Sequence, residues 1–301
     1  MKLPSQSSSA PVPEGFDEFW AEVDSDLALH AAAPGVEKLR IRSSDYCTVY
    51  GVSLTSLGAY RIFAYYSVPT GTGPFPALFC TPPYGSVAAL PDLSVRRTYV
   101  VLTLAHRGQR NADLDWAAEF PGLLTDGILS PRTFAFRGIV ADCCRATEFL
   151  VGRPEVDLAR VAITGNDLAI LTASRRSVFK AVQSMDLILY RAMEARLLFR
   201  DYPLEELNDY VRAHPDREES VGRSLSMVDP MHHASRISVP AHLTFSGELD
   251  RKWLRPLFDR LARPEWYRRT FHGAVDVAAC DDWLADQLSV IAVRPFQRPM
   301  W

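Results

Sequence analysis

The sequence lacks any long hydrophobic run. Hydrophobic residues make up 48% of its 301 residues, yet no stretch approaches the roughly 18 apolar residues of a membrane-spanning helix. The first residues, MKLPSQSSSAPVPEGF, contain one lysine and no apolar core, so they do not resemble a signal peptide. We therefore expect a cytoplasmic protein that does not enter a membrane, with a loose tail over residues 1–13.

The sequence also lacks an excess of charge of either sign. Lys and Arg number 33, Asp and Glu 36, and the formal net charge is -3. This balance gives no electrostatic reason to expect nucleic acid or an anionic membrane as partner. The short basic pairs Arg175-Arg176 and Arg268-Arg269 are expected on solvated helix or loop faces. A small-molecule substrate is the expected partner.

Patterns that hold metals or nucleotides are missing as well. The five cysteines show no C-x-x-C or Cys/His ligand spacing, and their odd number indicates reduced thiols in a cytoplasmic protein. His232 and His233 are adjacent, which is not metal spacing in itself. There is no phosphate-cradling glycine loop and no dinucleotide fingerprint. We expect no metal and no cofactor.

The pattern that is present alternates strands with helices. An amphipathic helix is expected over 14–32 and antiparallel strands over 37–56 and 59–69. Short apolar runs that end in polar loops then alternate with helical segments, which indicates a mostly parallel sheet covered on both faces. Residues 1–301 are expected to form one domain, with a helical cap inserted at about 189–236. The later strands are expected within 75–86, 98–109, 160–165, 181–188, 239–250 and 266–272, and the later helices within 130–153, 253–262 and 281–293.

Three acid–base residues follow predicted strands. Asp167 comes after VAIT, Asp250 after HLTFS and His272 after YRRTF. Catalytic groups of open α/β sheets collect at the carboxyl ends of the strands, so these three are predicted to converge. Their order along the chain, nucleophile, acid and histidine, is that of the α/β-hydrolase triad.

Several longer segments resemble one known family, the carbohydrate esterases that include acetyl xylan esterases and cephalosporin C deacetylases. The segments are GFDEFWAEV near the N-terminus, R-G-Q at Arg107-Gly108-Gln109, the stretch from Leu124 to Gly165 and the stretch from Glu218 to Asp250. The resemblance runs over nearly the whole chain. It implies an α/β-hydrolase fold and self-association into compact oligomers.

The resemblance also implies roles for individual positions. Asp250 and His272 fall at the triad aspartate and histidine. Tyr84 falls where a backbone N–H serves the oxyanion hole. Position 167 falls at the elbow, the sharp turn between strand and helix that carries the nucleophile in this fold. Leu168, which follows the elbow residue, would supply the second donor. Gln109 matches the glutamine of the R-G-Q loop. These positions imply a binding site for a small substrate.

Other positions depart from the family pattern. The family has serine at position 167, followed by glutamine and glycines, where this chain reads Asp167-Leu168-Ala169. It has glutamate and glycine after the histidine, where this chain has Gly273-Ala274-Val275. It has aspartate at position 105, where this chain has Ala105 followed by His106, a candidate extra proton donor. The predicted site is therefore rebuilt in several places.

The first interpretation of Asp167 is a nucleophile. A carboxylate is ionised at neutral pH and can attack the carbon of an epoxide, aziridine, halide or activated ester, giving an ester on the enzyme. His272, oriented by Asp250, would then activate water. Haloalkane dehalogenases and epoxide hydrolases have G-x-D-x-G elbows similar to GNDLA, although Leu168 stands where they usually carry tryptophan. An epoxide would also need acid donors from the cap, for which Tyr190 and Tyr210 are the candidates by their region of the sequence; each is expected rather to be a packing tyrosine.

Two other interpretations stay open. Asp167 could be a general base that promotes elimination, epimerisation or cyclisation, which needs a pKa raised by burial. It could instead cap the following helix in a catalytically inactive scaffold. The position of its carboxylate relative to His272 is the observation that separates these interpretations.

Overall fold

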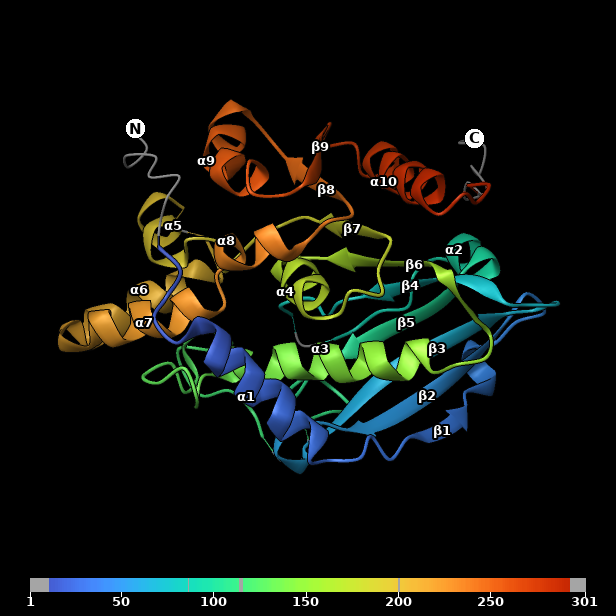
Figure 1. The fold of residues 1–301 in the computed structure, drawn as a ribbon, viewed down its shortest axis with the longest axis horizontal. Helices are drawn as coiled ribbons and strands as arrows, with labels where there is room; N and C mark the ends of the chain where they lie inside the picture. Colours follow the sequence, from blue (N-terminus) through green and yellow to red (C-terminus); the bar gives the residue numbers. More distant parts are fainter. Residues whose placement is uncertain (1–10, 86, 114–115, 200, 293–301) are drawn as a thin grey trace.

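Nine strands form one mixed sheet in the computed structural model, which describes residues 11–85, 87–113, 116–199 and 201–292 (Figure 1). The predicted antiparallel start and parallel remainder are both confirmed, since β1, β2, β3 and β5 pair antiparallel and every later pair is parallel. The order across the sheet is β1-β2-β3-β5-β4-β6-β7-β8-β9. The strands are β1 (Gly35–Lys38), β2 (Cys47–Thr55), β3 (Arg61–Pro69), β4 (Phe75–Cys80), β5 (Val100–Ala105), β6 (Val156–Gly165), β7 (Ala181–Ser184), β8 (Pro240–Phe245) and β9 (Arg263–Arg268).

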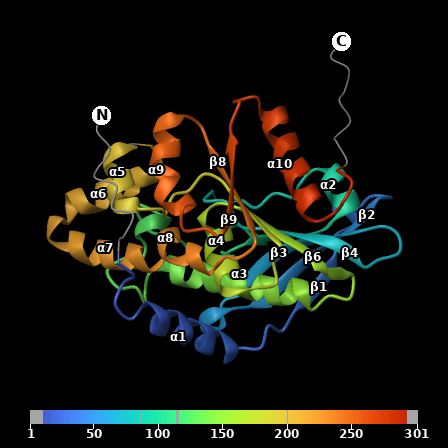
Figure 2. The same cartoon turned by 45° about the horizontal axis from the view of Figure 1, so that its top comes forward.

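Helices cover both faces of this sheet. Helices α1, α3 and α4 pack on one face, and α2 and α10 on the other, where Leu284 and Leu288 meet Val101 (Figure 2). All six residues of β5 are buried because they lie between these two layers. The helices are α1 (Phe16–Ala28), α2 (Leu93–Thr98), α3 (Ala135–Val151), α4 (Asp167–Arg175), α5 (Ala192–Leu198), α6 (Leu204–Ala213), α7 (Glu218–Met227), α8 (Pro230–His233), α9 (Glu248–Phe258) and α10 (Gly273–Gln287).

The predicted cap corresponds to helices α5 to α8, which leave the sheet after β7 and return at β8 (Figure 1). One of its anchors is α6, which buries Leu204, Glu206, Leu207 and Val211. Because the cap follows β7 directly, its inner helices lie beside the carboxyl ends of β7 and β8. That placement decides which side chains surround the candidate site.

Several predicted boundaries need correction. The strand expected over 37–56 divides into β1, which ends at Lys38, and β2, which begins at Cys47. The helix expected over 253–262 begins at Glu248. Helix α3 begins at Ala135, because the Ser130–Phe134 segment makes turns that bond back to Gly127 and Ser130. Strand β9 ends at Arg268, four residues before His272. Helix α10 begins at Gly273, where expectation placed a helix only from about 281. The histidine therefore stands at the start of a helix.

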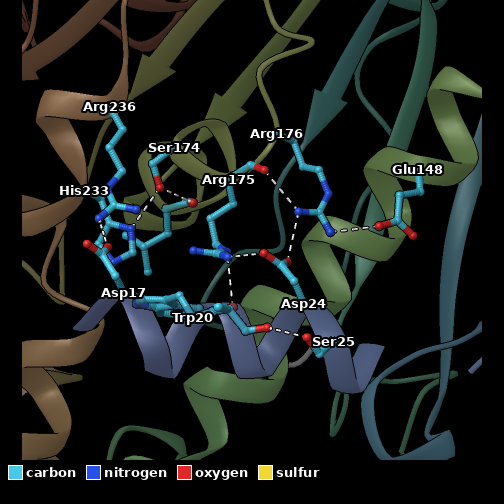
Figure 3. A network of polar contacts seen from close by, with 12 residues as sticks. Asp17, Trp20, Asp24, Ser25, Glu148, Ser174, Arg175, Arg176, His233 and Arg236 are labelled. Atoms are coloured by element: carbon cyan, nitrogen blue, oxygen red, sulfur yellow. Dashed lines mark hydrogen bonds and ion pairs between the residues drawn. The ribbon is translucent and has the colours of Figure 1, made fainter. Parts of the chain in front are cut away.

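The expectation that Arg175 and Arg176 are solvated is wrong. Their side chains are 8% and 20% exposed, because α1 covers them. Arg175 donates to the Trp20 carbonyl oxygen and to Asp24, and Arg176 bridges Asp24 to Glu148 of α3 (Figure 3). These bonds join the C-terminal end of α4 to helices α1 and α3, and so fix the position of the helix that begins at Asp167.

No helix in the described part of the chain is long and apolar enough to cross a membrane. Residues 1–10 of the expected tail lie outside the described residues.

Candidate functional site

The turn between β6 and α4 is built on a glycine. Gly165 has φ 151°, and a Cβ there would lie 1.8 Å from Thr81 Oγ1, so only glycine fits. Asn166 caps α4 by accepting the Leu168 N–H at 3.0 Å. Asp167 is the first residue of α4 and does not have a positive φ. The strained turn that presents a nucleophile in a hydrolase elbow is therefore not formed here.

The carboxylate of Asp167 is occupied by the backbone. One oxygen accepts the Ile188 N–H at 2.6 Å, and the other accepts those of Leu189 and Tyr190 at 3.0 and 3.1 Å. The residue is 1% exposed. Burial raises its pKa to about 6, and the three N–H donors act against this rise. In this geometry the side chain anchors the segment that links β7 to the cap.

A second buried carboxylate, Asp229, continues this anchor. It accepts the Arg191 N–H at 3.1 Å and the Met231 N–H at 2.9 Å, so it joins the cap entry to the start of α8. Burial is the largest cause that raises its pKa to about 7, and the charge of Asp167 adds to the rise. Sequence reasoning missed Asp229, which precedes a proline like many helix caps and carried no other signal.

These raised pKa values predict an unusual pH dependence. Both carboxyl groups hold a proton more tightly in the folded chain than in the unfolded one, where the pKa is 3.8. Their stabilising contribution is therefore complete below about pH 4 and is lost as the pH rises through about 6 to 7.

We expect the free energy of unfolding of Asp229→Asn, relative to wild type, to rise between pH 5 and pH 8 by more than about 1.4 kcal/mol, the equivalent of one pKa unit. Urea denaturation at several pH values measures this difference. Asp259→Asn is the control, because Asp259 is half exposed and its carboxylate accepts from Arg255, one turn earlier at the end of α9. A flat difference for Asp229→Asn would contradict the assignment.

The surroundings of the predicted oxyanion donors are closely bonded. The Leu168 N–H, one of the two expected donors, already bonds Asn166. At Tyr84, whose backbone N–H is the other expected donor, the side-chain hydroxyl donates to Glu206 of the cap at 2.6 Å. The Leu124 N–H donates to the same hydroxyl at 2.9 Å. The space between Tyr84, His106 and Asp167 measures about 10 Å³, which is room for at most one water molecule. The side chains around the turn at Asp167 therefore leave no room there for a substrate.

His106 and Gln109 brace the neighbouring loop. His106 Nδ1 donates to the Arg107 carbonyl oxygen at 2.5 Å, so Nε2 carries no proton in the neutral ring. Burial lowers the pKa of His106 to about 4, which keeps it neutral. Gln109 donates to the carbonyl oxygens of Pro83 and Gly85, at 2.8 and 2.5 Å. In this state His106 can accept a proton near the elbow but cannot supply one.

Asp250 lies apart from Asp167, in the wall of a larger cavity. It sits in the first turn of α9 and accepts the Ser246 N–H at 2.8 Å. The cavity, about 520 Å³, lies between the ends of β7 and β8 and helices of the cap. Burial raises the pKa of Asp250, and Arg269 acts in the opposite direction.

His272 is exposed at the start of α10. Its backbone N–H donates to Thr270 Oγ1 at 3.2 Å, and its carbonyl oxygen accepts the N–H groups of Val275 and Asp276. Asp276, which sequence reasoning missed, accepts bonds from the Tyr267 hydroxyl and from Thr270. These bonds hold the loop that carries His272 against the first turn of α10.

Three parallel strands are thus followed, at one edge of the sheet, by Asp167, Asp250 and His272, as predicted. The predicted convergence of the three side chains is not seen. Within the described residues no hydrogen bond or ion pair joins any two of them. Of the two cap tyrosines, Tyr190 is buried with its hydroxyl on the Trp253 carbonyl oxygen, and Tyr210 contacts Arg217. The described ranges contain no group of side chains suited to a metal ion.

Comparison with known proteins identifies the relatives of this arrangement. The sequence profile of the family described as "Acetyl xylan esterase (AXE1)" matches residues 2–252. The acetyl xylan esterase from Paenibacillus sp. R4 superposes with a TM-score of 0.80 at 20% identity, over 91% of this chain and 94% of that one. Acetyl xylan esterase 1 from Thermoanaerobacterium sp. JW/SL YS485 gives a TM-score of 0.82 at 19% identity, over 95% and 99%. At such identities the superpositions show a shared fold, that of the α/β-hydrolases.

Proposed function

The chain belongs to the acetyl xylan esterase family of α/β-hydrolases, and from that premise we propose that it binds a small molecule between sheet and cap without serine-dependent ester hydrolysis. The observation that carries the proposal is the state of the elbow carboxylate. Both oxygens of Asp167 accept backbone N–H groups, and the residue is buried. A buried carboxylate that accepts three backbone N–H groups has a structural role, which differs from the role of a hydroxyl nucleophile.

The surroundings of Asp167 support the same proposal. The space in front of the elbow holds at most one water molecule, whereas the cavity beside Asp250 has the size of a ligand site. It also lies at the carboxyl ends of parallel strands, where open α/β sheets bind their ligands. In the described structure no hydrogen bond or ion pair joins His272 to Asp250, so this carboxylate does not fix the imidazole as a base.

A second candidate function is supported by the shared sheet edge. The strands β6, β8 and β9 are still followed by Asp167, Asp250 and His272 at one edge of the sheet. The Asp167 carboxylate is held by the N–H groups of residues 188–190, so a movement of that segment away from the carboxylate would free it. At a pKa of about 6, Asp167 is largely ionised at neutral pH, as a nucleophile toward an epoxide, aziridine, halide or activated ester must be. A general base would need the same release.

Hydrolysis assays and mass spectrometry test both candidates. We expect wild type and Asp167→Ser to hydrolyse 4-nitrophenyl acetate no faster than a buffer blank, because neither has an oriented histidine. We also expect no mass increase when His272→Ala is incubated with styrene oxide or 1-bromobutane. Intact folding of each variant is checked by its thermal unfolding transition.

The contrary results are distinct. Ester turnover by wild type that Asp167→Asn abolishes would overturn the proposal. A stable adduct on Asp167 in His272→Ala would establish the nucleophile instead. Turnover of another substrate with solvent deuterium exchange, without an adduct, would identify Asp167 as a general base.

A further inference from the structure

Most of the charged side chains that line the cavity between sheet and cap are acidic. We infer that this cavity binds an organic cation, with an ammonium group at Asp250 and an apolar body against Trp253. This inference deepens the proposed function and rests on small-molecule binding at this place. The cavity of about 520 Å³ falls within the range that holds drug-sized ligands.

Carboxylates outnumber cations among the described residues of the wall. Asp186, Asp201 and Asp250 line the cavity, against one cation, Arg269. Arg269 is already paired with Asp186 at 2.7 Å. Asp250 accepts a single hydrogen bond, from the Ser246 N–H to one oxygen, in the described structure. A half-buried carboxylate whose neighbouring cation, Arg269, is already paired with another aspartate favours a ligand that brings a cation.

Another part of the cavity wall is apolar and aromatic. Trp253 and Leu254 are each 5% exposed, and both line the cavity together with Phe199. The Trp253 ring already makes one cation–π contact, with the Arg191 guanidinium carbon 4.3 Å from its centroid. Since Asp250 and Trp253 are three residues apart on α9, they project from the same side of that helix. One ligand can therefore touch the charge and the indole together.

An unpaired hydroxyl in the same wall points to a missing partner. Thr244 lines the cavity at the end of β8 and is 7% exposed. Its Oγ1 atom is buried and has no hydrogen-bond partner in the described structure. Buried hydroxyls in native proteins are nearly always bonded, and a ligand N–H group would satisfy this one. The wall of this cavity thus holds two acceptors, the Thr244 hydroxyl oxygen and the Asp250 carboxylate, and a primary ammonium has three N–H donors to offer.

Isothermal titration calorimetry with three matched probes tests the inference. The probes are 4-phenylbutylammonium, 4-phenylbutanol and 4-phenylbutyrate, which share an apolar body and differ in charge. We expect the ammonium to bind the full chain at least tenfold more tightly than the other two, and its affinity to fall with added NaCl. We expect Asp250→Asn to weaken it at least tenfold, because the amide keeps the bond from Ser246 and removes the charge. Asp259→Asn, near the other end of α9, should leave it unchanged.

Other outcomes separate the cation from the cavity. If the alcohol binds as tightly as the ammonium, the charge preference is overturned while small-molecule binding stands. If the carboxylate binds best, the cavity is an anion site and the inference fails. If none of the probes binds, the inference also fails, and the proposed function is judged by its hydrolysis and adduct assays, which use neither these probes nor Asp250 variants. Loss of ammonium binding in Asp259→Asn as well would show that Asp250 is not the recognition group.

Discussion

Replacing Asp167 by alanine should lower the free energy of unfolding by about 3–5 kcal/mol. The side chain accepts the N–H groups of Ile188, Leu189 and Tyr190, and a buried N–H left without a partner costs about 1–3 kcal/mol. The partial exposure of Ile188 lets water reach one of the three, and removal of a buried carboxylate offsets part of the loss. Urea denaturation at neutral pH measures the change.

Two further variants make this prediction specific. Asp167→Asn keeps one acceptor oxygen, so its loss of stability should fall between those of wild type and Asp167→Ala. Asp17→Ala is the control, since Asp17 is an exposed aspartate in the first turn of α1 and its ion pair should contribute little. If Asp167→Ala unfolds at the same urea concentration as wild type, the carboxylate is not an anchor, and the case for a catalytic role becomes stronger.

Most of the fold could be predicted because its signals are local. The alternation of β2 and the short apolar runs of β4, β5 and β8 follow directly from the burial of one or both faces of a strand. The start of α10 could not, because Gly273-Ala274-Val275 has no helix-start signal. Asp276 fixes this turn by accepting bonds from Thr270 and Tyr267, six and nine residues earlier, and no pattern in the sequence announces these bonds.

The candidate site was predictable in its place but not in its geometry. Strand ends locate Asp167 and Asp250 at one edge of the sheet, since that depends only on the order of strands. Where each side chain points depends on partners distant in sequence. The Asp167 carboxylate turns toward residues 188–190, and Tyr84 toward Glu206, 122 residues away. The cavity beside Asp250 is formed by elements distant in sequence, so sequence reasoning could not anticipate it.

The buried ion pair behind the R-G-Q loop should give the other large effect. Asp142 in α3 is fully buried and accepts the Arg107 backbone N–H and two guanidinium N–H bonds, at 3.1, 3.0 and 2.8 Å. The Ser56 hydroxyl donates to it as well, at 2.5 Å. Gly138 leaves the space that the guanidinium occupies, because a Cβ there would lie 2.5 Å from Arg107 Cζ.

We expect Asp142→Leu to lower the free energy of unfolding by about 3–5 kcal/mol, because it leaves the Arg107 guanidinium buried without a counter-charge. Arg107→Met should cost a similar amount, since it strands the carboxylate. The double variant should cost less than the two single losses added together, because a buried pair replaced by apolar side chains leaves no uncompensated charge. Urea denaturation of the four proteins measures the coupling. Strictly additive losses would mean that each residue acts through other contacts, and the loop that carries His106 and Gln109 would then need a different support.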